Sequence, residues 1–145
     1  MSLELSSSAF SNNESIPREY TADGRDSPPP LAIAGVPKDA QSLALVIEDP
    51  DAPRKNFTHW VLYDIPPDAT ELPSHQAANG INDFGNRGYG GPKPPSGTHR
   101  YVFKLYALDT KIDAKEPLDK HELQARMKGH VIEQAELTGT YARAS

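Results

Sequence analysis

Hydrophobic and polar positions along the chain predict three strands of a buried core. Ser42–Ile47 is a continuous apolar run that is too short for a typical helix, so it predicts a strand buried on both faces. Phe57–Ile65 is the next predicted strand, and the prolines that follow it end the pairing. Arg100–Leu108 alternates apolar and polar side chains with a period of two, as a half-buried strand requires.

One segment has the signals of a helix. Lys120–Lys128 follows Asp119, a suitable N-cap residue, and Glu122 stands after Asp119 in the spacing of a capping box. Gly129 can end the helix, because glycine readily adopts the left-handed backbone found at helix C-termini. The pattern therefore predicts a short helix near the C-terminus.

The remaining segments carry weaker signals. Met1–Ser15 is polar and predicts an edge strand or a loose arm, and Leu31–Ile33 follows prolines that force extended backbone. Ala69–Gly85 has little periodicity and predicts a long irregular connection. His130–Gln134 is compatible with one more helical turn, and Glu136–Arg143 predicts a last strand or an extended tail.

Composition narrows the class of protein. The 145 residues suit a single domain, residues 1–145, and 14 prolines with 10 glycines favour short strands joined by tight turns. A net charge of −5 without a basic cluster argues against nucleic acid binding. No apolar run approaches the ~20 residues of a membrane span, and the N-terminus lacks the pattern of a secretory signal. Because cysteine is missing, disulfides and thiolate metal sites are excluded, and we expect a cytoplasmic protein.

The stretch Gly88–Tyr101 combines backbone-controlling residues with a histidine. Its glycines permit unusual backbone conformations and close approach of a ligand, while its prolines stiffen the loop. Such a loop suits a preformed pocket wall that offers backbone N–H groups to an anion. The alternative is a rigid proline-rich turn without a binding role.

Three side chains at predicted strand ends are candidates for chemistry: Asp49, His59 and His99. If their strands are neighbours, the three side chains converge at one rim, where the carboxylate would favour the protonated form of both imidazoles. Protonated histidines and glycine N–H groups would then form a pocket for a small phosphate or carboxylate. Each histidine has the alternative of being a half-buried residue with satisfied hydrogen bonds.

Enzymatic alternatives use the same cluster. One carboxylate and two histidines are the ligand types of an iron or zinc site, although the helix-borne spacings typical of metal sites are missing. A serine-type hydrolase would need Ser96 or Thr58 beside a histidine, without the usual nucleophile motif. The residues by themselves therefore predict a β-rich domain with an anion pocket and leave these alternatives open.

Several stretches together resemble the phosphatidylethanolamine-binding protein family, also called Raf kinase inhibitor-like proteins. They are DPDAP at Asp49–Pro53, FTHWVLYDIP from Phe57 and GYGGPKPPSGTHRYVFKLYALD from Gly88. The resemblance extends over nearly the whole chain and favours the bacterial and archaeal branch. It implies a mainly β fold, an antiparallel β-sandwich of Greek-key type with one or two short peripheral helices near the C-terminus. It also implies a small pocket for anionic groups such as phosphate, phosphorylated head groups and acetate.

Carried over onto this sequence, the resemblance assigns a set of ligand-binding residues. They are Asp49 as the carboxylate, His59 and His99 as the histidines, Pro53 at the rim, Gly91 and Pro92 as the loop wall, and Tyr101 just inside. Asp51 matches the second acid of the family motif, and we expect it to hold the loop rather than touch the ligand.

Two departures from the family pattern bear on this hypothesis. Ala22 and Lys93 stand where many prokaryotic relatives carry cysteine, which argues against a redox role, and we expect Lys93 to point to solvent. The C-terminal extension of the mammalian members is missing, which weakens a phospholipid-binding interpretation.

The resulting hypothesis is non-enzymatic binding of a small phosphorylated or carboxylated ligand, without cofactor or metal, linked to regulation of a kinase, a protease or another signalling partner. A hydrolase or metal-dependent enzyme that uses Asp49, His59 and His99 is the alternative. A protein-interaction scaffold with a vestigial pocket is a third interpretation. A homodimer is suggested by family analogy alone.

Overall fold

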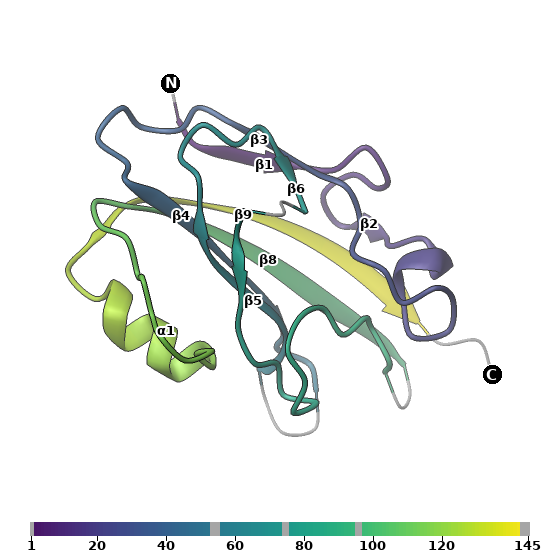
Figure 1. Cartoon of the computed structure of the whole chain (residues 1–145). Coiled ribbons are helices and arrows are strands. Elements are labelled where there is room, and N and C mark those ends of the chain that lie inside the picture. Colours follow the sequence, from purple (N-terminus) through teal and green to yellow (C-terminus); the bar gives the residue numbers. More distant parts are fainter. Residues whose placement is uncertain (1, 53–55, 74–75, 95–96, 143–145) are drawn as a thin grey trace.

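The structure, a computed structural model, describes residues 2–52, 56–73, 76–94 and 97–142 and is built mainly from strands (Figure 1). The strands are β1 (Glu4–Ser6), β2 (Glu14–Ser15), β3 (Leu31–Ala34), β4 (Ser42–Asp49), β5 (Phe57–Ile65), β6 (Glu71–Leu72), β7 (Ala78–Asn79), β8 (Thr98–Leu108) and β9 (Val131–Ala142). A 3₁₀ turn, η1, covers Arg18–Tyr20, and the α-helix α1 covers Lys120–Met127. No helix within the described part of the chain is long and apolar enough to cross a membrane.

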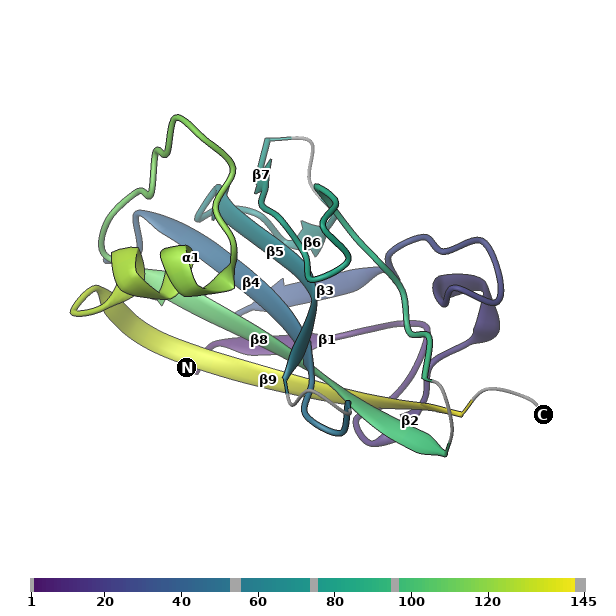
Figure 2. The same ribbon diagram turned by 90° about the horizontal axis from the view of Figure 1, so that it is seen from below.

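The strands form two sheets. The larger sheet has the order β2-β9-β8-β4-β5-β7, and the smaller one has the order β1-β3-β6. Every named pair is antiparallel except β2 with β9. Figure 2 shows β4, β5, β8 and β9 side by side in one twisted sheet. The prediction of a mainly β, antiparallel sandwich is therefore confirmed.

The central strand β4 is buried on both faces, as its continuous apolar run predicted. Leu43, Leu45 and Ile47 point into the core between the two sheets. Ala44 and Val46 belong to a second cluster, which also contains the buried residues of α1. Figure 1 shows what covers the two faces of the larger sheet: the smaller sheet lies on one side and α1 lies on the other. Because β4 has no solvent face, it fixes the position of the strands beside it.

The helix begins where the sequence predicts, and its end corrects one expectation. Asp119 accepts a hydrogen bond from the backbone N–H of Glu122, and the Glu122 side chain accepts one in return, which completes the capping box. The suggested extra turn at His130–Gln134 is wrong. Gly129 adopts a φ of +83°, and β9 begins at Val131, where it pairs with Leu108. The backbone groups of the segment after His130 bond to the edge of β8, so they do not need the partners that a further helical turn would have given them.

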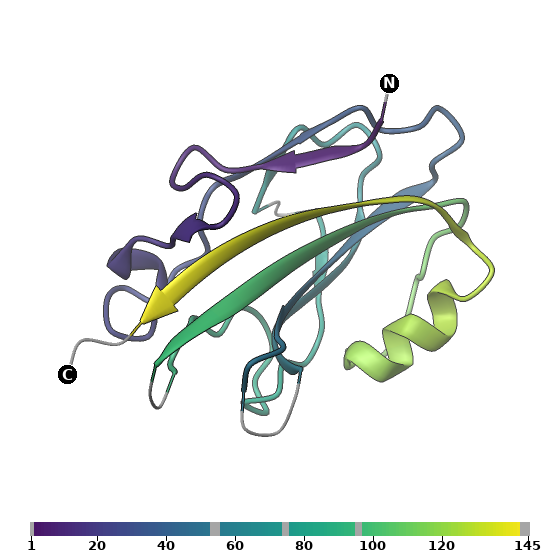
Figure 3. The ribbon, with the colours of Figure 1, turned by 180° about the vertical axis from the view of Figure 1, so that it is seen from behind.

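The loops and ends of the chain also differ in detail from the pattern. The N-terminal segment supplies β1, an edge strand of the smaller sheet. The long connection predicted for Ala69–Gly85 contains two very short strands, β6 and β7, one in each sheet. The last strand is longer than expected, and Figure 3 shows β9 running beside β8 along its length.

Removing side-chain volume from the centre of β4 should cost a large part of the stability. Leu45 is fully buried, so we expect Leu45→Ala to lower the free energy of unfolding by about 2–5 kcal/mol. Ile132→Ala is a matched control, because Ile132 is 39% exposed and should change the value by about 0.5 kcal/mol or less. Urea unfolding of the three proteins measures both values, and equal losses for the two variants would contradict this account of the core.

Candidate functional site

The ends of three strands meet at one end of the larger sheet. Asp49 at the end of β4 pairs with Phe57 at the start of β5, and β8 runs antiparallel to β4 on its other side. The sequence placed Asp49, His59 and His99 at such ends, and the structure brings all three to one cavity of about 190 Å³. The residues that line it are Asp49, Ala52, Phe57, His59, Phe84, Lys93 and His99.

A β-bulge at His59 determines which way this side chain points. Trp60 pairs with Ile47 and Thr58 pairs with Glu48, so His59 is an extra residue opposite β4. In a regular strand, His59 and Trp60 would face opposite sides of the sheet. Here Trp60 packs in the core between the sheets, and the His59 ring lies 5.2 Å from that of Tyr101 on the same side. The bulge thus aims His59 at the cavity, a common use of bulges beside functional sites.

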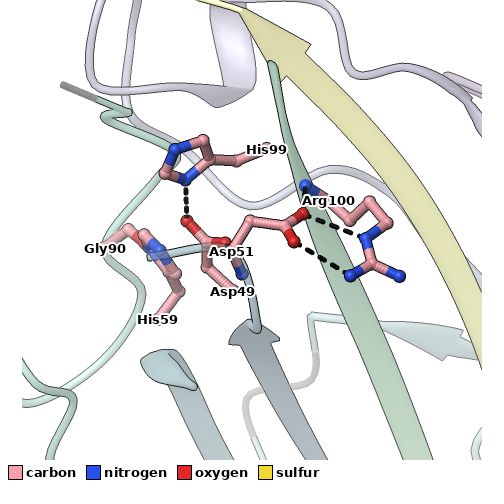
Figure 4. Close-up of polar contacts among 6 residues, drawn as sticks. All are labelled: Asp49, Asp51, His59, Gly90, His99 and Arg100. Atoms are coloured by element: carbon pink, nitrogen blue, oxygen red, sulfur yellow. Dashed lines mark hydrogen bonds and ion pairs between the residues drawn. The ribbon is translucent and has the colours of Figure 1, made fainter. Parts of the chain in front are cut away.

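Asp49 and His99 form a buried pair at the cavity. His99 Nδ1 donates to Asp49 Oδ2 at 2.5 Å, as Figure 4 shows, and the two residues are 7% and 3% exposed. Asp49 Oδ1 accepts a second bond from the backbone N–H of Asp51 at 2.8 Å. Both oxygens of a buried carboxylate are therefore engaged, which offsets the cost of removing its charge from water.

Asp51 lies beside the cavity and is bound to Arg100. Its carboxylate accepts from the backbone N–H, Nε and one terminal nitrogen of Arg100, each at 2.9 Å. The side-chain hydrogen bond from Arg100, followed by the backbone one, lowers the pKa of Asp51 to about 2. Asp51 is not among the residues that line the cavity. Its bonds connect the segment after β4 to the start of β8.

His59 is held in a different way from His99. Its Nδ1 lies 2.7 Å from the carbonyl oxygen of Gly90, and the residue is 4% exposed. The rings of Phe57, Phe84 and Tyr101 surround it, with centroids 5.0–5.4 Å away. Burial lowers the pKa of His59, and it outweighs the opposing effects of the Gly90 carbonyl and of Asp49. The expectation that Asp49 would keep this imidazole protonated is therefore wrong for His59, which is neutral at neutral pH.

Three glycines of the loop do not offer their amides to the cavity. Gly88, Gly90 and Gly91 do not form an anion nest, because their N–H groups all have partners within the protein. They donate to the carbonyl of Gly80, to the carbonyl of His59 and to Asp26 Oδ1, at 3.1, 2.9 and 2.6 Å. These amides fix the loop against the rest of the fold and are not free to bind a ligand.

Gly91 and Pro92 serve as structural residues of this wall. A Cβ on Gly91 would lie 2.9 Å from the carbonyl oxygen of Tyr20, so only glycine fits this close approach. The carbonyl of Pro92 accepts from the backbone N–H of Ala22 at 3.0 Å. Gly91 lines a neighbouring cavity, and neither residue is among those that line the one beside Asp49.

Tyr101, expected just inside the pocket, packs against the His59 ring and is not among the residues that line the cavity. The residue is fully buried, and its hydroxyl has no hydrogen-bond partner among the described residues. Burial, and next the charge of Asp49, raise the pKa of Tyr101, so the phenol keeps its hydrogen. A buried hydroxyl without a partner costs free energy, and a ligand oxygen within reach would offset that cost.

Several lining residues were not predicted as site residues. Phe57 stands two positions before His59, and strand alternation could have flagged it. Phe84 comes from the irregular connection, is 41% exposed and lies at the mouth of the cavity without any clear sequence signal. Lys93 is exposed, as expected, yet it also lines the cavity. Pro53 lies outside the described residues.

The lowered pKa of His59 should make stability depend on pH. The unfolded chain binds a proton at His59 near its ordinary pKa of 6.5, whereas the folded chain resists it. The contribution of neutral His59 to the free energy of unfolding is complete above pH 6.5. It is lost as pH falls below 6.5, because the unfolded state then binds more protons than the folded state. We expect the stability difference between the wild type and His59→Gln to shrink from about pH 7 to 5.

Chemical denaturation at several pH values measures this difference. His130→Gln is the control, because His130 is exposed and pairs with Asp109 at the other end of β8. A difference between wild type and His59→Gln that stays constant over this range would show that the folded protein does not resist protonation at His59.

Comparison with known proteins gives consistent matches over nearly the whole chain. The family model described as phosphatidylethanolamine-binding protein matches residues 6–142. A UPF0098 protein from Methanothermobacter thermautotrophicus is 46% identical over 150 residues, which cover 97% of this chain and 99% of that protein. A UPF0098 protein from Pyrococcus horikoshii is also 46% identical, over 99% of this chain and 78% of its own length.

Solved structures agree with the fold. A protein from Chlamydia trachomatis, described as a homologue of phosphatidylethanolamine-binding protein, superposes with a TM-score of 0.95 at 38% identity and 99% coverage of both chains. YbcL of E. coli, described as a member of the mammalian PEBP family, gives a TM-score of 0.91 at 29% identity, covering 99% of this chain and 100% of its own. The resemblance seen in the sequence motifs is thereby confirmed, and the chain belongs to the phosphatidylethanolamine-binding protein family.

Proposed function

We propose that this protein binds a small anionic ligand in the cavity beside Asp49, without catalysing a reaction on it. The observation that carries the proposal is the buried Asp49–His99 pair, which faces a cavity that His59 also lines. Buried ionisable groups gathered at a cavity are costly to the fold and are commonly kept for binding or catalysis. The ligands we propose are phosphate, a phosphorylated head group or a carboxylate.

The size of the cavity supports a small ligand. Its volume of about 190 Å³ lies below the ~300 Å³ from which pockets for drug-sized molecules usually start. Phe57 and Phe84 provide apolar walls, and Lys93 provides a cation at the mouth. Such a cavity suits a single anionic group, with the rest of a larger ligand left outside.

The site geometry supports the following roles for the residues around a bound ligand. Lys93 supplies positive charge, and His99 keeps Nε2 for the ligand because its Nδ1 is used by Asp49. Tyr101 supplies a hydroxyl that has no partner among the described residues. Asp51 positions the neighbouring backbone through Arg100. Gly91 and Pro92 contribute the shape of the loop, because the N–H of Gly91 is used by Asp26 and proline has no N–H.

Enzymatic alternatives receive less support from the geometry. Within the described ranges, no three or more His, Cys, Asp or Glu side chains are grouped so that they could hold a metal ion. Among the described residues the buried hydroxyl of Thr58 has no hydrogen-bond partner, so no histidine there can activate it. Ser96 lies outside the described residues. A hydrolytic nucleophile would need such a base within hydrogen-bond reach.

A regulatory role completes the proposal. An anion bound at the cavity mouth changes the charge of a surface that carries the exposed residues Phe84 and Lys93. We propose that this surface contacts a protein partner, such as a kinase or a protease, and that the ligand controls the contact. The family name and the description of the Chlamydia protein refer to phosphatidylethanolamine binding, so the head group of such a lipid is among the ligands to test.

A titration with inorganic phosphate followed by NMR of the histidine rings tests ligand binding. We expect saturable shifts of the His59 and His99 resonances in the wild type, and loss of binding by tenfold or more in His99→Ala, because a charge-assisted hydrogen bond contributes about 1.5–3 kcal/mol. His130→Ala is the matched control, since His130 also bonds an aspartate, at 2.7 Å, but far from the cavity. The absence of any shift with phosphate, phosphoethanolamine or acetate would refute the proposal.

A further inference from the structure

The hydrogen bond of His59 fixes which of its ring nitrogens can meet a ligand. A carbonyl oxygen can only accept, so His59 Nδ1, at 2.7 Å from the oxygen of Gly90, carries the hydrogen. In the neutral ring the other nitrogen, Nε2, is then an acceptor. His59 lines the cavity, so this lone pair is the group that its neutral imidazole can offer to a ligand.

Asp49 adds a second acceptor to the same cavity. Its carboxylate is bound by His99 and by the backbone of Asp51, yet each carboxylate oxygen has a further lone pair. An oxyanion without a hydrogen would set its own lone pairs against those of Asp49 and His59. Such contacts between acceptors are repulsive unless a hydrogen lies between them.

The donors of the cavity lie elsewhere. The amides of Gly90 and Gly91 are used within the protein, so they cannot balance these acceptors. Lys93 and His99, whose Nε2 is not used by Asp49, line the cavity and can donate. The hydroxyl of Tyr101, whose ring packs against His59, has no partner among the described residues and can also donate. Donors on some sides and acceptors on others suit a ligand that both accepts and donates hydrogen bonds.

We propose that the cavity selects an oxyanion that carries an acidic hydrogen. The class comprises inorganic phosphate and singly protonated phosphate monoesters, bound with their P–O–H group directed at His59 Nε2 or Asp49. Sulfate, phosphodiesters and fully ionised monoesters lack that hydrogen and are discriminated against. This inference rests on the proposed function and specifies the ligand of the same site.

The surroundings of His59 support this role. Asp49 on β4 and Asp83 in the segment after β7 carry negative charge near the ring, and each raises its pKa. Tyr101 and His99 on β8, together with Lys93 in the glycine loop, complete the polar groups around it. Burial still lowers the pKa of His59 below its ordinary value, so the ring stays an acceptor at neutral pH.

A series of small anions tests the proposal on the unmodified protein. At about pH 8, inorganic phosphate and sulfate carry nearly the same charge and have the same shape, but only phosphate has a hydrogen to donate. We expect phosphate to bind about tenfold or more tightly than sulfate in calorimetric or NMR titrations, because a buried acceptor left unpaired costs about 1–3 kcal/mol. Dimethyl phosphate should bind as weakly as sulfate.

Methyl phosphate separates the effect of the hydrogen from that of shape. Its second pKa is near 6, so it loses its hydrogen between about pH 5.5 and 8. We expect its affinity to fall over this range relative to that of inorganic phosphate, which keeps a hydrogen throughout. A ratio of the two affinities that does not change with pH would contradict the proposal.

Two variants assign the selection to named residues. His59→Leu removes the acceptor, so the preference for phosphate over sulfate should decrease toward one, provided circular dichroism shows a folded protein. Lys93→Met removes a charge that attracts both anions, so both affinities should fall while their ratio stays as in the wild type. Lys93 is exposed, so this variant should fold.

The outcomes distinguish this inference from the proposed function. If phosphate and sulfate bind equally well to the wild type, the site binds anions but does not select for a hydrogen, and the inference is overturned. If no anion of the series binds, the proposed function itself fails. A long-range proton–nitrogen correlation spectrum of the free protein provides an independent check, because it must show the hydrogen of neutral His59 on Nδ1; finding it on Nε2 would overturn the inference without any ligand.

Discussion

The hydrogen bond between His99 Nδ1 and Asp49 Oδ2 is the interaction on which the site depends. It joins the start of β8 to the end of β4 in a place where both residues are almost fully buried. Loss of either partner would leave the other buried and unpaired, which costs far more than the bond contributes. The adjacent residues Asp51 and Arg100 repeat the connection on the exposed side. Two neighbouring acids thus hold the same two chain segments, one facing the cavity and the other facing solvent.

Burial and charge act in opposite directions on the second histidine. Asp49 favours a protonated His59, but three aromatic rings and the loss of water around the imidazole favour the neutral form more strongly. The two histidines of the site are therefore unequal: His99 donates to a carboxylate and His59 donates to a backbone carbonyl. The cavity is not a uniformly cationic pocket, and its acceptors matter as much as its donors. If the cavity binds an oxyanion as we propose, the same chemistry makes the protonation state of that ligand a determinant of binding.

The glycine–proline loop shows how far a local pattern can be interpreted. Its glycines did indicate close approach of another group to the backbone. At Gly91 that group is the chain itself, at Tyr20 and Asp26, and not a ligand. A glycine can reflect a positive φ, as at Gly88, or tight space, as at Gly91, and it carries no information about what fills that space. The partner of each amide is set by segments far away in the sequence, and it became visible only when those segments were placed.

The sequence by itself determined the elements whose signals are local. The burial of β4 followed from an unbroken apolar run, the face of β8 from a period of two, and the start of α1 from the spacing of Asp119 and Glu122. It also placed three polar residues at strand ends, which antiparallel pairing then brought together. The tertiary structure decided the rest: the bulge that turns His59, the arrival of Phe84 at the cavity, and the carbonyl that fixes the hydrogen on the imidazole. Local patterns record the period of the backbone and which faces are buried. The protonation state and orientation of a side chain depend on neighbours that only packing brings within a few ångströms.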